Sequence, residues 1–269
     1  MIKQALTIAG SDSGGGAGIQ ADLKTFHAHG VYGASVVTAI TAQNTVAVTR
    51  AFDLPLDLIE AQLDAVFDDL DIAAAKTGML SSAEIVETVA GALRDRRFEM
   101  LVVDPVMISK SGYKLLRDDA IESLKKNLLP LALVVTPNIH EAELLSGVRI
   151  DSADKMKLAA GRIRECGPRN VLVKGGHASF DRATDILYDG EQFHEFVSKF
   201  IQTKNTHGTG CTYSAAITAR LALGEPLFSA IEHAKAYITQ AIAHALPIGK
   251  GHGPTNHFYF LRSDDFLKG

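Results

Sequence analysis

A glycine-rich segment that runs into an apolar helix carries the strongest chemical signal in this sequence. The segment is Asn205-Thr206-His207-Gly208-Thr209-Gly210-Cys211, and a helical apolar pattern follows over Cys211–Leu223. The first N–H groups of a helix have no partner within it, and the positive end of its dipole lies there. Gly208, Thr209 and Gly210 are therefore predicted to form an anion site, which suits the charge that develops on a phosphoryl group in transfer.

Cys211 falls in the first turn of that helix, where the positive dipole is expected to lower the pKa of its thiol. A thiolate at this position could act as a base or as a nucleophile. A free cysteine is more often an inert core residue, but the flanking glycines and the helix terminus favour a chemical role here. Cys166, beside Gly167-Pro168, keeps the inert interpretation.

A second glycine-rich stretch, Gly10–Gly18, follows an apolar run and precedes a helix that is expected to begin near Ile19. Glycine permits positive φ and close approach of the backbone, so such a turn can wrap around a ligand. The stretch is not a P-loop, because no Gly-Lys-Ser/Thr follows at the required spacing. Its density of glycine favours ligand contact over a merely flexible turn.

Two carboxylates and a lysine also follow apolar runs. Asp104 and Glu141 offer oxygen ligands of the kind that Mg²⁺ takes together with waters and substrate phosphates. Asn138, three residues before Glu141, competes as an ordinary helix-capping residue. Lys174 could neutralise nucleotide phosphates, although an isolated lysine is as often simply solvated.

Gln43 directly follows the apolar run Ser35–Ile40. Its carboxamide offers a donor and an acceptor side by side, which matches the amine and ring nitrogen of an aminopyrimidine. The alternative is a polar residue at a strand end that meets only water. The ten histidines show no zinc-ligand spacing, so a zinc site is not expected.

Apart from the segment Asn205–Cys211, these residues share one position in the chain pattern, because each follows a short run rich in Val, Ile and Ala. Helical stretches separate the runs, which predicts an α/β fold with a mainly parallel sheet and helices on both faces. Ligands bind beyond the carboxyl ends of such strands, so the residues should converge at one sheet edge. A hairpin is expected at Asp189-Gly190. The runs are Ala5–Ala9, Ser35–Ile40, Ile72–Ala75, Leu101–Val103, Leu133–Val135 and Val171–Val173.

Composition bounds the remaining possibilities. The chain has 269 residues, a formal net charge of −4, 46% apolar and 22% charged residues, which excludes a disordered or coiled-coil protein. No basic block is present, so a nucleic-acid partner is not expected. Two cysteines cannot build a disulfide framework, and neither a signal peptide nor a membrane span is recognisable. One cytoplasmic α/β domain over residues 1–269 is predicted.

Taken together, these motifs resemble a known family. Residues 205–212 are similar to the anion-hole signature of ribokinase-like kinases, in the variant with cysteine where most members carry aspartate. The whole combination resembles the hydroxymethylpyrimidine/phosphomethylpyrimidine kinases of thiamine biosynthesis, from about Ala5 to Phe258. The other motifs that carry the resemblance are Ala5–Asp12, Thr41–Thr45, Lys76–Leu80, Asp104–Met107, Thr136–Asn138 and Lys174–His177.

The resemblance implies a ribokinase-like fold and small-molecule substrates. Kinases of this kind use ATP and Mg²⁺ to phosphorylate 4-amino-5-hydroxymethyl-2-methylpyrimidine, and then its monophosphate to the pyrophosphate; relatives are often homodimers. By resemblance, Cys211 takes the place of the catalytic base and Gly208–Gly210 that of the anion hole. The pyrimidine pocket would be formed by Gln43, Gly10, Asp22, Met79 and Val106. The metal would be held by Asn138, Glu141 and Asp104, and the nucleotide by Lys174 and Thr206.

Three alternatives stay open at this point. A cysteine-containing pyridoxal kinase would share the fold and Cys211, but resembles this chain less at Gln43–Thr45 and Lys174–His177. A cysteine hydrolase could use Cys211 with His207 as base, but would leave Asn138 and Glu141 unexplained. A non-catalytic pyrimidine sensor would not need the base or the metal ligands. A flap that closes over the site is predicted around Ser109–Gly112, on composition alone.

Overall fold

The computed structural model describes residues 1–108, 112, 115–176 and 182–261. Its nine strands form one sheet in the order β3-β2-β1-β4-β5-β6-β7-β8-β9. Pairing is parallel from β2 through β7 and antiparallel at both ends, for β2 with β3, β7 with β8 and β8 with β9. The strands are β1 (Gln4–Asp12), β2 (Tyr32–Gln43), β3 (Val48–Asp53), β4 (Ile72–Thr77), β5 (Leu101–Val103), β6 (Val134–Val135), β7 (Asn170–Val173), β8 (Arg182–Tyr188) and β9 (Phe193–Lys199).

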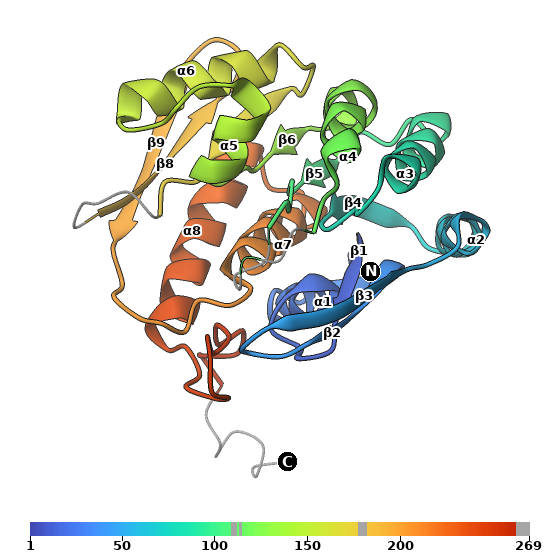
Figure 1. Cartoon of the computed structure of the whole chain (residues 1–269), viewed down its shortest axis with the longest axis horizontal. Helices are drawn as coiled ribbons and strands as arrows, with labels where there is room; N and C mark the ends of the chain where they lie inside the picture. Colours follow the sequence, from blue (N-terminus) through green and yellow to red (C-terminus); the bar gives the residue numbers. More distant parts are fainter. Residues whose placement is uncertain (109–111, 113–114, 177–181, 262–269) are drawn as a thin grey trace.

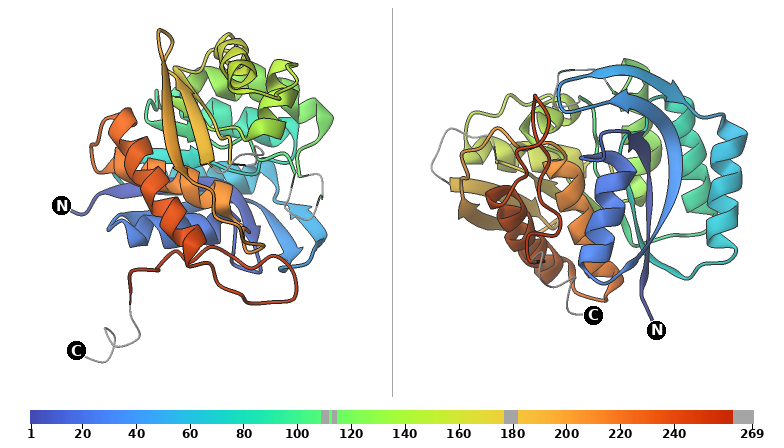
Figure 2. Two further views of the ribbon diagram at one scale, coloured as in Figure 1. Left: turned by 90° about the vertical axis from the view of Figure 1, so that its left-hand side faces the viewer. Right: turned by 90° about the horizontal axis from the view of Figure 1, so that it is seen from below.

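Helices cover both faces of the sheet (Figures 1 and 2). One layer contains α2 (Leu56–Phe67), α3 (Ala83–Asp95), α4 (Asp118–Ser123), α5 (Ile139–Ser146) and α6 (Ala153–Arg164). A π-helical turn, Leu124–Leu128, and a 3₁₀ turn, Leu129–Leu131, continue α4. The other layer contains α1 (Gly18–Ala28), α7 (Thr209–Ala222) and α8 (Leu227–Ala243).

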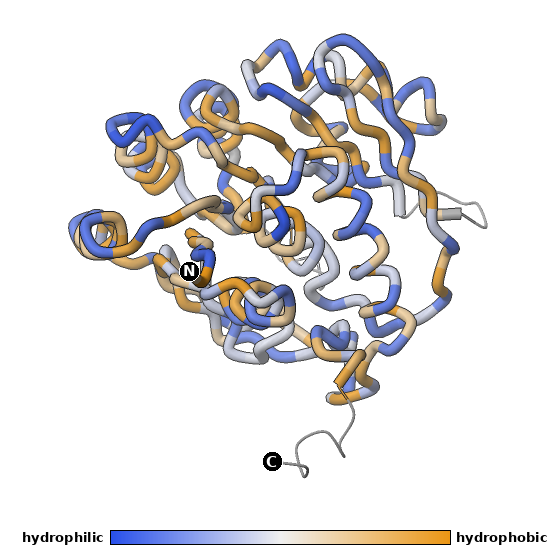
Figure 3. The backbone as a smooth tube through the Cα atoms, turned by 180° about the vertical axis from the view of Figure 1, so that it is seen from behind, coloured by the Kyte–Doolittle hydropathy of each residue, from blue (hydrophilic) through white to orange (hydrophobic). Residues whose placement is uncertain are grey.

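Two hydrophobic cores explain why the strands are almost continuously apolar. In β5, Leu101 and Val103 belong to the core shared with α2–α6, whereas Val102 belongs to the core shared with α1, α7 and α8. Successive side chains of a strand point to opposite faces, so a strand covered on both sides needs apolar residues at every position. Figure 3 shows the consequence, with hydrophobic strands inside and helices that mix hydrophilic and hydrophobic residues outside.

The predicted fold class is confirmed, with small changes in element bounds. The run Leu133–Val135 forms a strand only over Val134–Val135, and α7 begins at Thr209, two residues before Cys211. The hairpin between β8 and β9 turns at Asp189-Gly190, where Gly190 has a φ of 103°. Of the predicted flap, residues 109–111 lie outside the described part of the chain. Within that part, no helix is long and apolar enough to cross a bilayer.

Candidate active site

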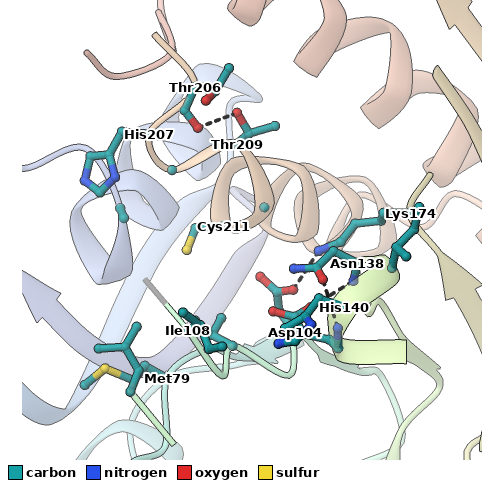
Figure 4. A pocket seen from close by; sticks show the side chains of 18 of the residues that line it. Met79, Asp104, Ile108, Asn138, His140, Lys174, Thr206, His207, Thr209 and Cys211 are labelled. Atoms are coloured by element: carbon teal, nitrogen blue, oxygen red, sulfur yellow. Dashed lines mark hydrogen bonds and ion pairs between the residues drawn. The ribbon is translucent and has the colours of Figure 1, made fainter. Parts of the chain in front are cut away.

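A cavity of about 1120 Å³ lies beyond the carboxyl ends of the parallel strands, at the start of α7. The expected convergence is therefore present. Figure 4 shows the Cys211 side chain projecting from the start of α7, with Met79 and Ile108 on one side and Asp104, Asn138 and Lys174 on the other. The sequence-predicted residues that line the cavity are Gly10, Gln43, Met79, Asp104, Val106, Asn138, Glu141, Lys174, Thr206, Gly208, Thr209, Gly210 and Cys211.

Asp22 is the exception, and its predicted place in the pyrimidine pocket is wrong. Its side chain is fully buried and does not line the cavity, because it lies behind Lys76. Lys76 Nζ is 2.9 Å from Asp22 Oδ2, and the Thr7 hydroxyl donates to the same oxygen at 2.6 Å. Asp22 thus holds a lysine rather than a substrate.

Lys76 itself is a cavity residue that the sequence analysis did not single out. It is fully buried and belongs to β4, yet it lines the cavity. Burial favours the neutral amine, but the hydrogen bond and charge of Asp22, together with the charges of Cys211 and Asp104, outweigh this effect and raise the pKa of Lys76 above its ordinary value. The sequence did contain a signal that could have identified Lys76 as a site residue: it is a lysine at the end of an otherwise apolar strand, two residues before Gly78.

The N-terminus of α7 is held in place by close backbone packing. Gly208 adopts a left-handed conformation, with a φ of 75°, and a Cβ at this position would overlap the carbonyl group of Gly16. The Thr209 hydroxyl donates to the Thr206 carbonyl at 2.8 Å. A Cβ at Gly210 would lie 3.5 Å from Lys174 Nζ. The free N–H groups of the helix therefore lie between the glycine-rich loop and a cationic side chain, as an anion site requires.

The expectation that this position lowers the pKa of the Cys211 thiol is wrong. Burial raises the pKa of Cys211 to about 12, although the nearby ammonium of Lys76 acts in the opposite direction. The helix dipole stabilises a charge by at most about 2 kcal/mol, and here the loss of water around the thiolate of the half-buried Cys211 outweighs it. Cys211 therefore carries its proton at neutral pH.

A buried ion pair lies on the α5 side of the cavity. Lys174 Nζ is 2.9 Å from Asp104 Oδ1, and the Ser214 hydroxyl of α7 donates to Asp104 Oδ2 at 3.1 Å. Burial would raise the pKa of Asp104, but Lys174 and Lys76 outweigh it and hold that pKa below its usual value. The pair is therefore ionic, and through Ser214 it connects the ends of β5 and β7 to α7.

Asn138 and Glu141 form a capping box at the start of α5, so the capping interpretation of Asn138 is confirmed. The Glu141 N–H donates to Asn138 Oδ1 at 3.0 Å, and the Asn138 N–H donates to Glu141 Oε2 at 2.8 Å. Burial raises the pKa of Glu141 to about 7; Lys174 offsets part of this rise and Asp104 adds to it. The capping box holds a second carboxylate near Asp104, and both line the cavity.

The opposite end of the cavity is less polar. The terminal methyl of Met79 packs over Gly10, where a Cβ would come within 2.6 Å of it, and the Thr38 hydroxyl donates to the Met79 carbonyl at 3.0 Å. Gln43 lies beside them at the end of β2. An apolar wall with one carboxamide fits a flat heterocycle with a polar edge.

His207 takes a different position from that of a hydrolase base. Its Nε2 atom lies 2.8 Å from Asp12 Oδ2, so it is directed to a carboxylate and not to the Cys211 thiol. Asp12 in turn anchors the glycine-rich loop, because its oxygens accept from the N–H groups of Gly14 and Ala17, both at 2.8 Å. The sequence does not predict this pairing, since Asp12 and His207 are 195 positions apart.

Comparisons with known proteins agree with this geometry. The sequence model of the phosphomethylpyrimidine kinase family matches residues 12–256. The chain is 53% identical to the hydroxymethylpyrimidine/phosphomethylpyrimidine kinase of Haemophilus influenzae, covering 97% of this chain and 98% of that protein. It is 54% identical to a bifunctional thiamine biosynthesis protein of Geobacter sulfurreducens over 94% of this chain, which spans only 51% of that longer protein.

The structure also superimposes on solved kinases. The crystal structure of an ADP complex of Bacillus subtilis pyridoxal kinase matches with a TM-score of 0.91 and 42% identity, covering 97% of this chain and 99% of that one. The fold is thus ribokinase-like, as the motifs imply. The family match and the two relatives above agree with one another over nearly the whole chain. The chain belongs to the phosphomethylpyrimidine kinase family and is a phosphotransferase.

Proposed function

We propose that this protein transfers the γ-phosphoryl group of ATP to the hydroxymethyl group of 4-amino-5-hydroxymethyl-2-methylpyrimidine, and then phosphorylates the resulting monophosphate to the pyrophosphate. One observation carries the proposal: a single cavity joins the amide of Gln43, the N-terminus of α7 and the Lys174–Asp104 pair. The Gln43 amide suits an aminopyrimidine edge, the N-terminus of α7 suits a phosphoryl group, and the Lys174–Asp104 pair suits a nucleotide phosphate.

In this arrangement the protein contributes mainly position and charge. The N–H groups at Gly208–Cys211 donate to the oxygens of the phosphoryl group in transfer, while Lys174 and Thr206 face the nucleotide. A bond forms from the hydroxymethyl oxygen to phosphorus, the bond from phosphorus to the bridging oxygen breaks, and ADP leaves. The alcohol proton passes to an oxygen of the transferred phosphoryl group or to water. Because the transition state is loose, little proton removal is needed before the new bond forms.

Cys211 is proposed to contact the hydroxymethyl group without acting as a resting thiolate base. Its thiol is protonated at neutral pH, so it cannot accept the alcohol proton directly. The pocket for the ring would be completed by Gly10, Met79 and Val106, which line the same end of the cavity. The rate would then come from alignment of the alcohol with the phosphoryl group and from the charge of the anion site.

We also propose a Mg²⁺ site at Asp104 and Glu141, next to Asn138. Two buried carboxylates with oxygen donors fit the preference of this ion, and water and phosphate oxygens would complete an octahedral shell. In the described residues no group of three or more His, Cys, Asp or Glu side chains that could hold a metal ion is found. When bound, Mg²⁺ would neutralise phosphate charge.

The proposed assembly is a homodimer of single-domain chains. The exposed face of the terminal strands β2 and β3 carries Ile40 and Phe52, which are direct cross-strand partners and are 52% and 61% exposed. Arg50 lies on the same face, opposite Ala42. A second copy of the chain would cover this apolar pair and the edge of β3, which are otherwise unfavourable to leave in water.

An assay of ATP consumption with three acceptors tests the function. The purified chain is supplied with the hydroxymethylpyrimidine, its monophosphate or pyridoxal, and ADP release is measured. We expect turnover with both pyrimidines to exceed that with pyridoxal. Turnover confined to pyridoxal would instead favour the pyridoxal kinase activity suggested by the structural similarity.

A Gln43→Leu variant tests the pyrimidine pocket. Loss of a paired hydrogen bond in a buried site costs about 1–3 kcal/mol, so the KM for the pyrimidine should rise by one or two orders of magnitude while the KM for ATP changes little. Equal increases in both KM values would show that Gln43 does not contact the ring.

A further inference from the structure

Lys76 lies between the two ends of the cavity. It belongs to β4, which stands between β1 and β5 in the sheet. Gln43 ends β2, on the far side of β1, and Lys174 follows β7, on the far side of β5. The order of the strands therefore places the Lys76 side chain between the end proposed for the pyrimidine and the end proposed for the nucleotide.

The ammonium group of Lys76 has donors that the protein does not use. A protonated lysine has three N–H donors, and within the described part of the chain Lys76 Nζ makes one hydrogen bond, to Asp22 Oδ2 at 2.9 Å. Lys76 and Gly78 both line the cavity, and a Cβ at Gly78 would lie 3.3 Å from Nζ. The missing side chain at Gly78 thus leaves the ammonium beside the cavity with two hydrogens to donate.

The same ammonium group acts on the start of α7. Of the influences that oppose the rise in the pKa of Cys211, the charge of Lys76 is the largest. Lys76 is fully buried, so protein and not water surrounds it, and its charge is weakly screened. Cys211 is the residue proposed to contact the hydroxymethyl group. A charged group attached to the hydroxymethyl oxygen would therefore lie within the field of Lys76.

Basic side chains are few at this site. Among the described residues that line the cavity, the lysine and arginine side chains are those of Lys76 and Lys174, and Asp and Glu side chains outnumber them. Lys174 is paired with Asp104 and lies at the end proposed for the nucleotide. An anionic acceptor needs a cation of its own, and Lys76 is in the position to supply it.

The two proposed acceptors differ in charge at this position. The alcohol is neutral, whereas a phosphate monoester carries a charge of about −1.5 to −2 at pH 7. In the second transfer, an ionised oxygen of this phosphate forms a bond to the γ-phosphorus of ATP, the bond to the bridging oxygen breaks, and ADP leaves. The acceptor phosphate must then lie between the ring and the anion site, where two phosphate groups of like charge meet.

We propose that Lys76, held by Asp22, recognises the phosphate of the monophosphate acceptor and so determines specificity for the second phosphorylation. The inference rests on the proposed function, in which both pyrimidines are acceptors. Lys76 balances the charge of the acceptor's own phosphate, while the N-terminus of α7 and Lys174 serve the phosphates of ATP. The neutral alcohol gains little from the ammonium group, so the first phosphorylation depends on it much less.

The test compares kcat/KM for the alcohol with kcat/KM for its monophosphate. In Lys76→Met/Asp22→Asn, which removes the charge pair as a whole, the value for the monophosphate should fall roughly ten- to a hundredfold more than that for the alcohol, as expected when a hydrogen bond to a charged group is lost. Lys76→Gln/Asp22→Asn, whose two amides can still pair, should show the same change and replaces the Met variant if that does not fold.

Thr7→Val is the matched control. It removes the other hydrogen bond to Asp22 Oδ2 and keeps the Lys76 ammonium group, so its preference between the two acceptors should stay close to that of the wild type. A change in preference as large as in the double variants would attribute the effect to packing around Asp22, and would overturn the inference. An equal loss toward both acceptors in the double variants, as expected of a merely structural pair, would also overturn it.

Calorimetry without nucleotide provides a readout that does not depend on turnover. The wild-type chain should bind the monophosphate roughly tenfold more tightly than the alcohol, and this difference should disappear in Lys76→Gln/Asp22→Asn. An unchanged difference in the variant would show that other groups receive the phosphate. These results leave the proposed function standing, whereas a wild-type chain that phosphorylates neither pyrimidine contradicts the proposed function, and the inference fails with it.

Discussion

Cys211 shows how two effects at one residue oppose each other. The start of α7 favours negative charge, yet the half-buried thiol is largely surrounded by protein, and this desolvation raises its pKa to about 12. Most ribokinase-like kinases resembled by this chain carry aspartate at this position, which would be far easier to ionise. With a protonated thiol here, the proposed reaction would depend on alignment and on the proposed anion site for its rate.

The state of this thiol can be measured directly in a Cys166→Ser background, which leaves Cys211 as the only cysteine of the chain. Because only the thiolate is nucleophilic, alkylation by iodoacetamide should remain slow through about pH 9 and accelerate only above it. The matched control is the Cys166→Ser/Cys211→Ala double variant, which should show no labelling. Rapid labelling near neutral pH would support the lowered pKa expected from the helix terminus alone.

At the scale of elements, buried polar pairs connect strands to helices around the cavity. Lys76 of β4 and Asp22 of α1 are both fully buried, and Thr7 of β1 donates to the same Asp22 oxygen. The pair therefore fixes α1 against two central strands and places an ammonium group at the cavity. Asp22 therefore holds the Lys76 side chain in place, in contrast to the direct contact with substrate that was predicted for it.

Lys76→Met should destabilise the fold by about 3–5 kcal/mol, because the Asp22 carboxylate would remain buried without its partner. Adding Asp22→Asn to this variant should recover part of the loss, since the uncompensated charge is then removed. Urea denaturation of both variants measures the difference. A single variant no less stable than the double variant would show that Lys76 does not neutralise Asp22.

Asp12 anchors the glycine-rich loop through three backbone N–H groups and His207. Its pKa is lower in the folded protein than its ordinary value, so its ionised form stabilises the fold at pH values above about 4. This contribution is lost as the pH falls through the folded pKa. Asp12→Asn should therefore lower Tm most near neutral pH, and the gap to wild type should close in acid. A gap that does not depend on pH would exclude an ionic contribution.

At the scale of the whole molecule, the single sheet with a core on each face determines where the cavity and the exposed apolar surface lie. The cavity lies at the carboxyl edge of the sheet, and the apolar pair Ile40 and Phe52 lies on strands β2 and β3. Strand β2 takes part in both sites, because Ile40 lies in the exposed apolar pair and Gln43, at the end of the same strand, lines the cavity.

Phe52→Glu should convert the proposed dimer to a monomer, because a carboxylate would have to be buried in the interface. Light scattering coupled to size-exclusion chromatography measures the molar mass. Leu158→Glu is the matched control, since Leu158 is a similarly exposed apolar residue on α6. A wild-type chain that is monomeric, or an unchanged mass in Phe52→Glu, would contradict the proposed interface.

Much of this protein follows from its sequence alone, because the relevant interactions are local or periodic. Apolar runs such as Leu101–Val103 specify strands covered on both faces, and the residues after them must meet at one sheet edge. The capping box of Asn138 and Glu141 and the hairpin at Asp189-Gly190 depend on contacts a few residues apart. These features were predictable from spacing and residue type.

Other features were decided only by tertiary structure. The pairing of Asp12 with His207 joins distant parts of the chain. Asp22 lies behind Lys76 and not in the pocket because α1 packs against β1 and β2, which brings Asp22 to the Lys76 ammonium of β4. The charge of Cys211 depends on how much water reaches it, which no spacing encodes. The packed fold determines which distant residues are in contact and how far each contact is shielded from water. These two properties set the ionisation states on which the chemistry depends.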